Sequence, residues 1–239
     1  MEPRVTVGAV GTSTPPAAPW ELTGECVVAL VRARPDRPSL PAGLHPVPGP
    51  LVVSAARFTE SPVGPYLELS VAEPARVGAR VGLCVTLMVV NSPDCRLGGR
   101  LNWGLPRELG TLRWLADDDE RTLAWEDRDL VVRGEPSGPS VPMVAPVRSL
   151  QRRADGLVVV GGHLRGHARP ARIEITAPDT DALAGLTGSH RGMLLSGVRM
   201  VVNPARRPAG LTATLRAPLR AAEPALSWAR EAQATLTGD

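Results

Sequence analysis

The carboxylate whose position best suits chemistry is Glu68. It lies in the alternating segment Tyr66–Ala72, where Tyr66, Glu68 and Ser70 share one face of a predicted strand and the apolar residues share the other. A carboxylate that faces a pocket can act as a general base or pair with a buried cation. On a half-buried strand the same residue would be an ordinary solvent-facing glutamate.

The cation that best complements it is Arg107, in the segment Gly98–Gly110. A guanidinium can hydrogen-bond a carboxylate or an enolate through two N–H groups at once. Glu108 follows directly, and adjacent strand residues point to opposite sides, so both would contact one ligand only in a turn. An exposed ion pair between them is the alternative. In the same segment, Arg100 most simply holds loop carbonyls or a carboxylate, and Trp103 most simply forms core or pocket wall.

The chain contains no lysine, and all 27 of its basic residues are arginine. A lysine amine can form an imine with a ketone, whereas arginine stays protonated and is not a usable nucleophile. The only amine is the N-terminus, which begins a segment rich in proline and glycine. Schiff-base chemistry on a carbonyl substrate is therefore not expected.

The segment around Arg107 resembles the acetoacetate decarboxylase family. In that family a hydrophobic strand leads into Gly-Arg-Glu, an aromatic residue and Pro-Lys-Lys-Leu-Gly. The ordered matches here are Gly99-Arg100, Trp103-Gly104, Pro106 and Leu109-Gly110. Upstream, Gly64-Pro65-Tyr66-Leu67-Glu68-Leu69 is similar to the family's Tyr-x-Glu strand, at an agreeing distance. The resemblance covers about residues 20–208 and implies a mainly β fold, an antiparallel β-barrel with small helical decorations, that assembles into a homo-oligomer.

The departures from the family pattern bear on the function. Arg107 and Glu108 replace two lysines, of which the first forms the Schiff base and the second depresses the pKa of the first. Leu101 replaces the glutamate of Gly-Arg-Glu, and Ser54 falls near a second acidic position, so only Glu68 remains of the recognisable acidic set. The resemblance then implies a mostly apolar pocket for a small keto or hydroxy acid. Its candidate catalytic residues are Glu68 and Arg107, and its candidate substrate-binding residues are Tyr66, Arg100, Trp103 and Glu108.

Two functions stay open at this point. The first is lyase-type chemistry on a small organic acid without an imine, with Glu68 as general base and Arg107 as carboxylate anchor or enolate stabiliser. The second is a non-catalytic module that binds such an acid and returns it unaltered. Activity that disappears in Glu68→Gln would separate the two.

No metal or cofactor is expected. The three cysteines are widely spaced and form no Cys-x-x-Cys pair, which indicates reduced thiols: Cys26, Cys84 and Cys95. Nucleotide-binding glycine patterns are absent. One strand face would alternate histidine and arginine if Gly166 does not bulge it: His163, Arg165, His167 and Arg169. Arginines between histidines repel a metal ion, so a solvated polar face or an anion-binding face is the better interpretation.

Composition narrows the class of protein further. A net charge of +3 on 239 residues gives no argument for nucleic-acid binding. The longest apolar stretch, around Val81–Val90, is too short to span a bilayer. Residues 1–19 show no basic segment followed by an apolar run, so we expect no signal peptide and a cytoplasmic location.

Short β-rich segments separated by Gly, Pro, Asp and Ser predict most of the chain's structure. We expect a flexible leader over residues 1–19 and one domain over residues 20–239. Short helices are predicted over Asp179–Leu186 and Leu226–Leu236. Strands are predicted near residues 24–33, 50–58, 66–72, 79–91, 111–115, 120–124, 129–134, 141–148, 157–165, 169–176 and 192–202.

Overall fold

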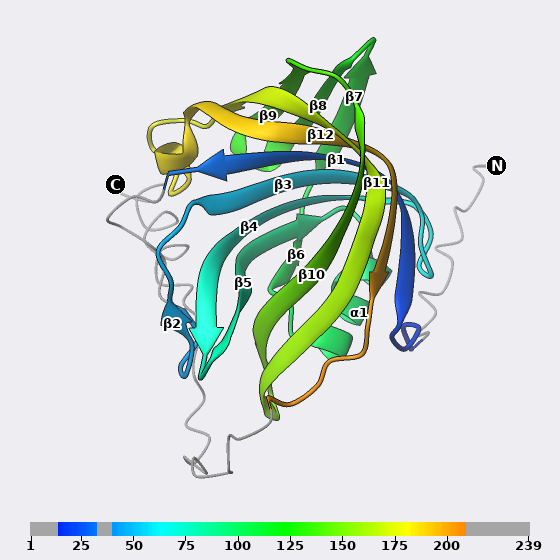
Figure 1. The fold of residues 1–239 in the computed structure, drawn as a ribbon, viewed down its shortest axis with the longest axis vertical. Helices are drawn as coiled ribbons and strands as arrows, with labels where there is room; N and C mark the ends of the chain where they lie inside the picture. Colours follow the sequence, from blue (N-terminus) through cyan, green and yellow to red (C-terminus); the bar gives the residue numbers. More distant parts are fainter. Residues whose placement is uncertain (1–13, 33–39, 209–239) are drawn as a thin grey trace, which may run out of the picture. The chain divides into compact units, whose positions relative to one another are not determined.

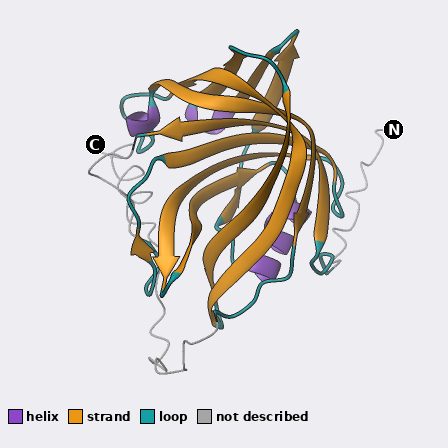
Figure 2. Cartoon of the chain, viewed as in Figure 1, coloured by secondary structure: helices purple, strands orange, loops and turns teal. Residues whose placement is uncertain are grey.

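The computed structural model describes residues 14–32 and 40–208 (Figure 1). Strands make up most of these residues, as Figure 2 shows. They are β1 Trp20–Val31, β2 His45–Pro46, β3 Leu51–Glu60, β4 Tyr66–Val77, β5 Arg80–Val90, β6 Arg107–Leu109, β7 Leu112–Asp117, β8 Glu120–Trp125, β9 Leu130–Pro136, β10 Val141–Arg153, β11 Gly156–Thr176 and β12 Gly188–Val202. The helical segments are α1 Pro93–Trp103 and two single 3₁₀ turns, η1 Glu126–Arg128 and η2 Ala184–Leu186.

All the strands described here belong to one 12-stranded sheet, part of which closes into a ring. Its path runs β10-β5-β4-β3-β1-β12-β11, and β10 also pairs with β11, so these strands close into a ring. The β10–β5 contact is a single parallel bridge between Ser149 and Leu83. Beyond Ala171, β11 pairs with β9 instead of β10, and β8 and β7 continue the sheet from there.

The mainly β class predicted from the sequence is confirmed. The sheet is mixed rather than purely antiparallel, because β5 makes parallel contacts with both β10 and β6. The β10 contact completes the ring, and the β6 contact holds a short strand that returns after α1. Both parallel contacts lie next to the candidate site described below.

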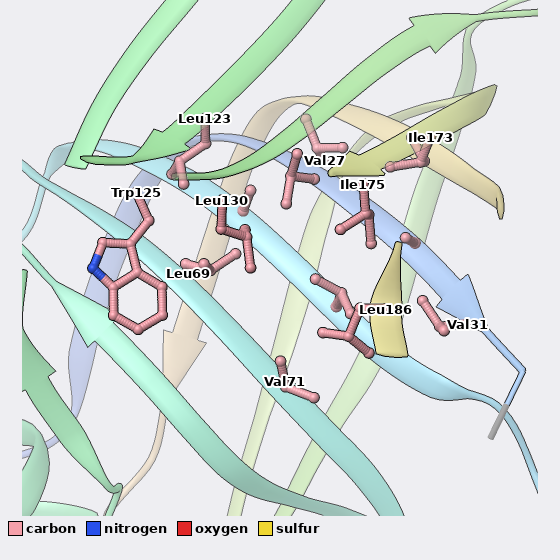
Figure 3. Packing of buried hydrophobic residues seen from close by; sticks show 14 of the residues in the cluster. Val27, Val31, Leu69, Val71, Leu123, Trp125, Leu130, Ile173, Ile175 and Leu186 are labelled. Carbon is pink, nitrogen blue, oxygen red and sulfur yellow. The ribbon is translucent and has the colours of Figure 1, made fainter. Parts of the chain in front are cut away.

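Several strands of the ring are buried on both faces. Val27, Ala29 and Val31 of β1 pack into a core beneath β8 and β9, shown in Figure 3 with Leu69 and Val71 of β4. The side chains that alternate with them form a second apolar cluster on the inner face of the ring. Because strand side chains alternate, placing Leu69 and Val71 in the first core turns Glu68 and Ser70 towards the inside.

Helix α1 was not predicted from the sequence. Gly98 and Gly99 in its interior lower its intrinsic helix propensity. Its ends carry ordinary signals: the Ser92 side chain accepts a hydrogen bond from the backbone N–H of Cys95 at 3.2 Å, a proline opens the helix, and Gly104 ends it in the left-handed conformation at φ 70°. Tertiary packing therefore stabilises α1 despite the low helix propensity of its two glycines.

Other boundaries also differ from the predictions. The two strands expected over residues 157–165 and 169–176 form one continuous strand, β11, with a register shift between Arg165 and His167. The helix expected over Asp179–Leu186 is wrong: only the 3₁₀ turn Ala184–Leu186 is present. The helix predicted over Leu226–Leu236 and most of the leader, residues 1–13, lie outside the described residues. No helix among residues 14–32 and 40–208 is long and apolar enough to cross a membrane.

Candidate functional site

Arg107 opens strand β6, which runs parallel to β5 with Arg107 opposite Met88. The side chain is buried, with 4% of its surface exposed. Its Nε donates to the Met88 Sδ at 3.1 Å, and Nη1 donates to the carbonyl oxygen and Sγ of Cys95 at 2.9 and 3.1 Å. These contacts come from β5 and α1, so the guanidinium is fixed by the two elements on either side of it.

The fourth contact of Arg107 is an ion pair with Glu68, whose Oε2 accepts from Nη2 at 3.0 Å. Glu68 lies on β4 with 12% of its side chain exposed. Burial raises the pKa of the Glu68 carboxyl, and the attraction and hydrogen bond of Arg107 offset this only in part. Glu68 can therefore take up a proton at a higher pH than a solvent-exposed glutamate.

The electrostatics keep Arg107 charged. Burial disfavours the guanidinium cation, but the attraction of Glu68, with contributions from Tyr66 and Cys95, leaves the pKa of Arg107 above its ordinary value. Burial also raises the pKa of the Cys26 and Cys95 thiols to about 12, and raises that of Tyr66 well above 10. At neutral pH these three side chains are uncharged, so neither thiol is an activated nucleophile.

Three aromatic rings surround the guanidinium. The Arg107 Cζ lies 5.8 Å from the ring centroids of Trp20 and Tyr66 and 6.0 Å from that of Trp103. Trp20 and Trp103 meet edge to face, with centroids 5.0 Å apart, and the Trp103 indole N–H donates to the carbonyl of Asn203 at 2.8 Å. Ring faces stabilise a desolvated cation, so this enclosure complements the charge that Glu68 balances.

Gly99 of α1 lets the helix approach Arg107 closely. A Cβ at this position would lie 2.4 Å from Cδ and 2.6 Å from Nε of Arg107, and the four hydrogen bonds of the guanidinium prevent it from moving aside freely.

We predict that Gly99→Ala lowers the free energy of unfolding by about 1–3 kcal/mol through overpacking, despite alanine's better helix propensity. Urea denaturation measures the change. The matched control is Leu101→Ala, an exposed helix position (58% exposed) where little change is expected. An unchanged or raised stability in Gly99→Ala would contradict the close approach.

The Glu68–Arg107 pair lines a cavity of about 240 Å³ inside the ring. Most of its wall is apolar, and Trp103 forms part of it. The remaining polar side chains on the wall belong to three serines and an arginine: Ser54, Ser70, Ser149 and Arg148. Arg148 is exposed and donates to the Val81 carbonyl at 3.4 Å. An apolar cavity with a few convergent polar groups is the usual form of a small-molecule site.

The other candidate binding residues lie outside this wall. Tyr66 is buried beside Arg107, and its hydroxyl has no hydrogen-bond partner of good geometry among the described residues. Arg100 is an exposed residue of α1 whose Nε donates to the Arg107 carbonyl at 2.7 Å, which holds the backbone of β6. Glu108 is exposed because β6 is a strand, and its side chain points away from that of Arg107.

Residues that the sequence did not single out complete the site. Trp20, Met88 and Cys95 contact the guanidinium from three different elements. No motif signals them, because each is an ordinary apolar residue of a strand or helix. The leader also reaches this region: the carbonyl of Pro16 accepts from the Trp20 indole and from the side-chain amide of Asn102, both at 2.9 Å.

The histidine and arginine face of β11 lies away from the cavity. His163, Arg165 and His167 are exposed, and Arg169 pairs with Asp119 at 2.8 Å. Within residues 14–32 and 40–208, no group of three His, Cys, Asp or Glu side chains could hold a metal ion.

Comparison with known families agrees with this architecture. The family model described as acetoacetate decarboxylase matches residues 3–132. The chain belongs to the acetoacetate decarboxylase family. No curated protein matches it. The family assignment confirms the resemblance seen in the sequence motifs around Glu68 and Arg107.

Solved structures show the same fold. The acetoacetate decarboxylase of Legionella pneumophila is similar at 17% identity and a TM-score of 0.60, covering 83% of this chain and 90% of that one. The enduracididine biosynthesis enzyme MppR, complexed with pyruvate, is similar at 16% identity and a TM-score of 0.63, covering 83% of this chain and 93% of that one. An acetoacetate decarboxylase-like enzyme from Sphingomonas wittichii is similar at 15% identity and a TM-score of 0.61, covering 84% of this chain and 100% of that one.

Proposed function

We propose that this acetoacetate decarboxylase family member binds a small keto or hydroxy acid non-covalently and exchanges a proton with it through Glu68. The observation that carries the proposal is the buried Glu68–Arg107 pair on the wall of an otherwise largely apolar cavity. The pyruvate complex of MppR supports the choice of ligand class, since that fold relative accommodates a keto acid. A cytoplasmic location and a homo-oligomeric assembly belong to the same proposal.

The chemistry proposed excludes an imine. Decarboxylation of a β-keto acid needs an electron sink at the ketone, which an imine provides, and the chain has no lysine to form one. Arg107 is held in its charged form by Glu68 and is not a nucleophile. Glu68 is the group that can gain or lose a proton near the ligand, because burial raises its pKa.

Arg107 supplies the positive charge that an anionic ligand requires. Its contacts with Met88, Cys95 and Glu68 use four of its five N–H groups. The remaining N–H, on Nη2, is available to a ligand oxygen or to the Tyr66 hydroxyl. A ligand carboxylate or enolate oxygen would therefore accept this N–H beside the carboxyl group of Glu68.

Binding of an anion should be coupled to uptake of a proton. In the buried part of the cavity Glu68 and Arg107 balance one another, so an anion would leave one net negative charge unless Glu68 is protonated. The bound anion therefore raises the pKa of Glu68 above its already raised value in the free protein. Between the two pKa values, affinity increases about tenfold for each unit by which pH falls, and below the lower one it levels off.

The experiment that tests the proposal is isothermal titration calorimetry with pyruvate and acetoacetate between pH 5 and 8. We expect tighter binding at lower pH, and binding in Glu68→Gln that no longer depends on pH. In parallel, borohydride is added to the acetoacetate complex, and intact mass should stay unchanged. Failure of both acids to bind would refute the proposal, and a borohydride-trapped adduct would refute its non-covalent chemistry.

One observation favours a second candidate, a binding module without turnover. The Arg107 side chain already makes four hydrogen bonds within the protein, as expected of a residue that stabilises the fold as well as contacting a ligand. The two candidates differ in one measurable property, which is the exchange of ligand C–H protons with solvent.

A further inference from the structure

Ser54 of β3 and Ser70 of β4 stand directly opposite each other in the antiparallel ladder. Side chains of such a pair lie on one face of the sheet, with Cβ atoms about 4.5–5.5 Å apart. Both serines line the cavity, so this shared face is the inner one. Their neighbours across the sheet in the same row are Val28 and Met88, which also line the cavity.

Among residues 14–32 and 40–208, neither serine hydroxyl hydrogen-bonds to a protein group; Ser70 is only 8% exposed, and Ser54 is half-buried. Polar groups inside proteins are normally paired, so two hydroxyls on one cavity wall require a partner, either water or a ligand. The fold gives no protein partner, because the residues next to them on the wall are apolar: Val28, Val52, Ala56, Ala72 and Met88. A ligand oxygen is the partner that the position of the two donors suits.

We propose that Ser54 and Ser70 form a second polar contact of the cavity, which binds a carbonyl or hydroxyl oxygen at the far end of the ligand. The inference rests on the proposed function and deepens it by stating where the second oxygen of the acid binds and how long the acid is. Two hydroxyls facing one point can both donate to a carbonyl oxygen, or can donate to and accept from a hydroxyl. The ligand is therefore an organic acid with a second oxygen function.

The spacing sets the length of this ligand. Ser70 lies two residues from Glu68 on the same strand face, which places the two side chains roughly 7 Å apart along β4. An acid whose carboxylate contacts Arg107 would then place its second oxygen roughly 5–7 Å away. A chain of about five carbons spans that distance, and the 240 Å³ cavity accommodates a molecule of that size.

The test compares two probes that differ by one carbonyl oxygen, pentanoate and 4-oxopentanoate, by calorimetry at about pH 5.5, near the acidic end of the range above, where anion binding should be tighter. With two neutral hydrogen bonds at stake, wild-type protein should bind 4-oxopentanoate about tenfold more tightly than pentanoate. In the Ser54→Ala/Ser70→Ala double variant this preference should fall below about twofold, with pentanoate affinity nearly unchanged. Ser196→Ala, at an exposed position of β12, is the matched control and should keep the preference.

The outcomes separate the two proposals. Equal affinity of wild-type protein for both probes, or a preference that survives in the double variant, overturns the role of the serines and leaves the proposed function standing. No binding of either probe to wild-type protein also overturns the role of the serines, and the titrations with pyruvate and acetoacetate then decide the proposed function separately. Thermal unfolding of each variant checks the fold, and the two single variants replace the double variant if it does not fold.

Discussion

Replacing Arg107 with methionine should lower the free energy of unfolding by about 3–5 kcal/mol at neutral pH. The substitution removes one partner of a buried ion pair and leaves the Glu68 carboxylate without its compensating charge, with its desolvation penalty no longer offset. It also leaves the Cys95 carbonyl without a donor that lies 2.9 Å away. Methionine has a similar length and is apolar, so the loss reports on charge and hydrogen bonding more than on volume.

The same argument predicts a rescue and a pH dependence. In Arg107→Met/Glu68→Gln no unpaired charge remains, and most of the lost stability should return. In the single variant the pKa of Glu68 is raised by burial without opposition, so folded protein binds the proton more tightly than unfolded protein. The deficit should therefore be largest at high pH and shrink as pH falls through the raised pKa of Glu68.

Urea unfolding at several pH values measures both effects. The control is Arg113→Met, which breaks an exposed ion pair with Glu126 (side chains 60% and 45% exposed) and should cost less than about 1 kcal/mol. A double variant as unstable as Arg107→Met alone would mean that the guanidinium stabilises the fold through Cys95 and Met88 rather than through Glu68.

The local part of the fold could be predicted from the sequence because it depends on alternation. In Tyr66–Ala72 the pattern placed Glu68 and Ser70 on one face, and both line the cavity. The closure of the ring could not be derived from the residue pattern and was expected only from the family resemblance. It depends on the bridge between Ser149 and Leu83, which are far apart in the sequence and carry no pairing signal. Helix α1 was missed because its two glycines, needed for close packing against Trp20 and Arg107, weaken the pattern that marks a helix.

The candidate site divides along the same line. Glu68 and Arg107 could be identified as candidate site residues from the sequence, because each is a charged residue with apolar neighbours and each lies in a motif of the family. Their surroundings were not, because Trp20, Met88 and Cys95 come from β1, β5 and α1 and meet only in the folded chain. Glu108 shows the remaining ambiguity: the sequence left its segment as strand or turn, and the strand geometry of β6 turns it to solvent.

Replacing Glu68 with glutamine should remove proton exchange between ligand and solvent while leaving ligand binding intact. Glutamine keeps the size of the side chain and can still accept a hydrogen bond from Arg107, but it cannot gain or lose a proton. A positioned general acid or base contributes about 10²–10⁴-fold to proton transfer, so the exchange rate should fall by that factor. Affinity for an anionic acid at neutral pH should rise or stay unchanged, because the competing carboxylate is gone.

The measurement is deuterium incorporation into the C3 position of pyruvate, followed by proton NMR in D₂O at saturating ligand. Glu108→Gln, an exposed glutamate on the opposite side of β6, is the matched control and should exchange at the wild-type rate. Exchange that persists in Glu68→Gln would remove this carboxylate from the mechanism. Wild-type protein that binds the acid with no exchange at all would identify a binding module. A Glu68 carboxyl with a raised pKa that acted as a base on the bound keto acid would remove a C3 proton and return a deuteron from the solvent.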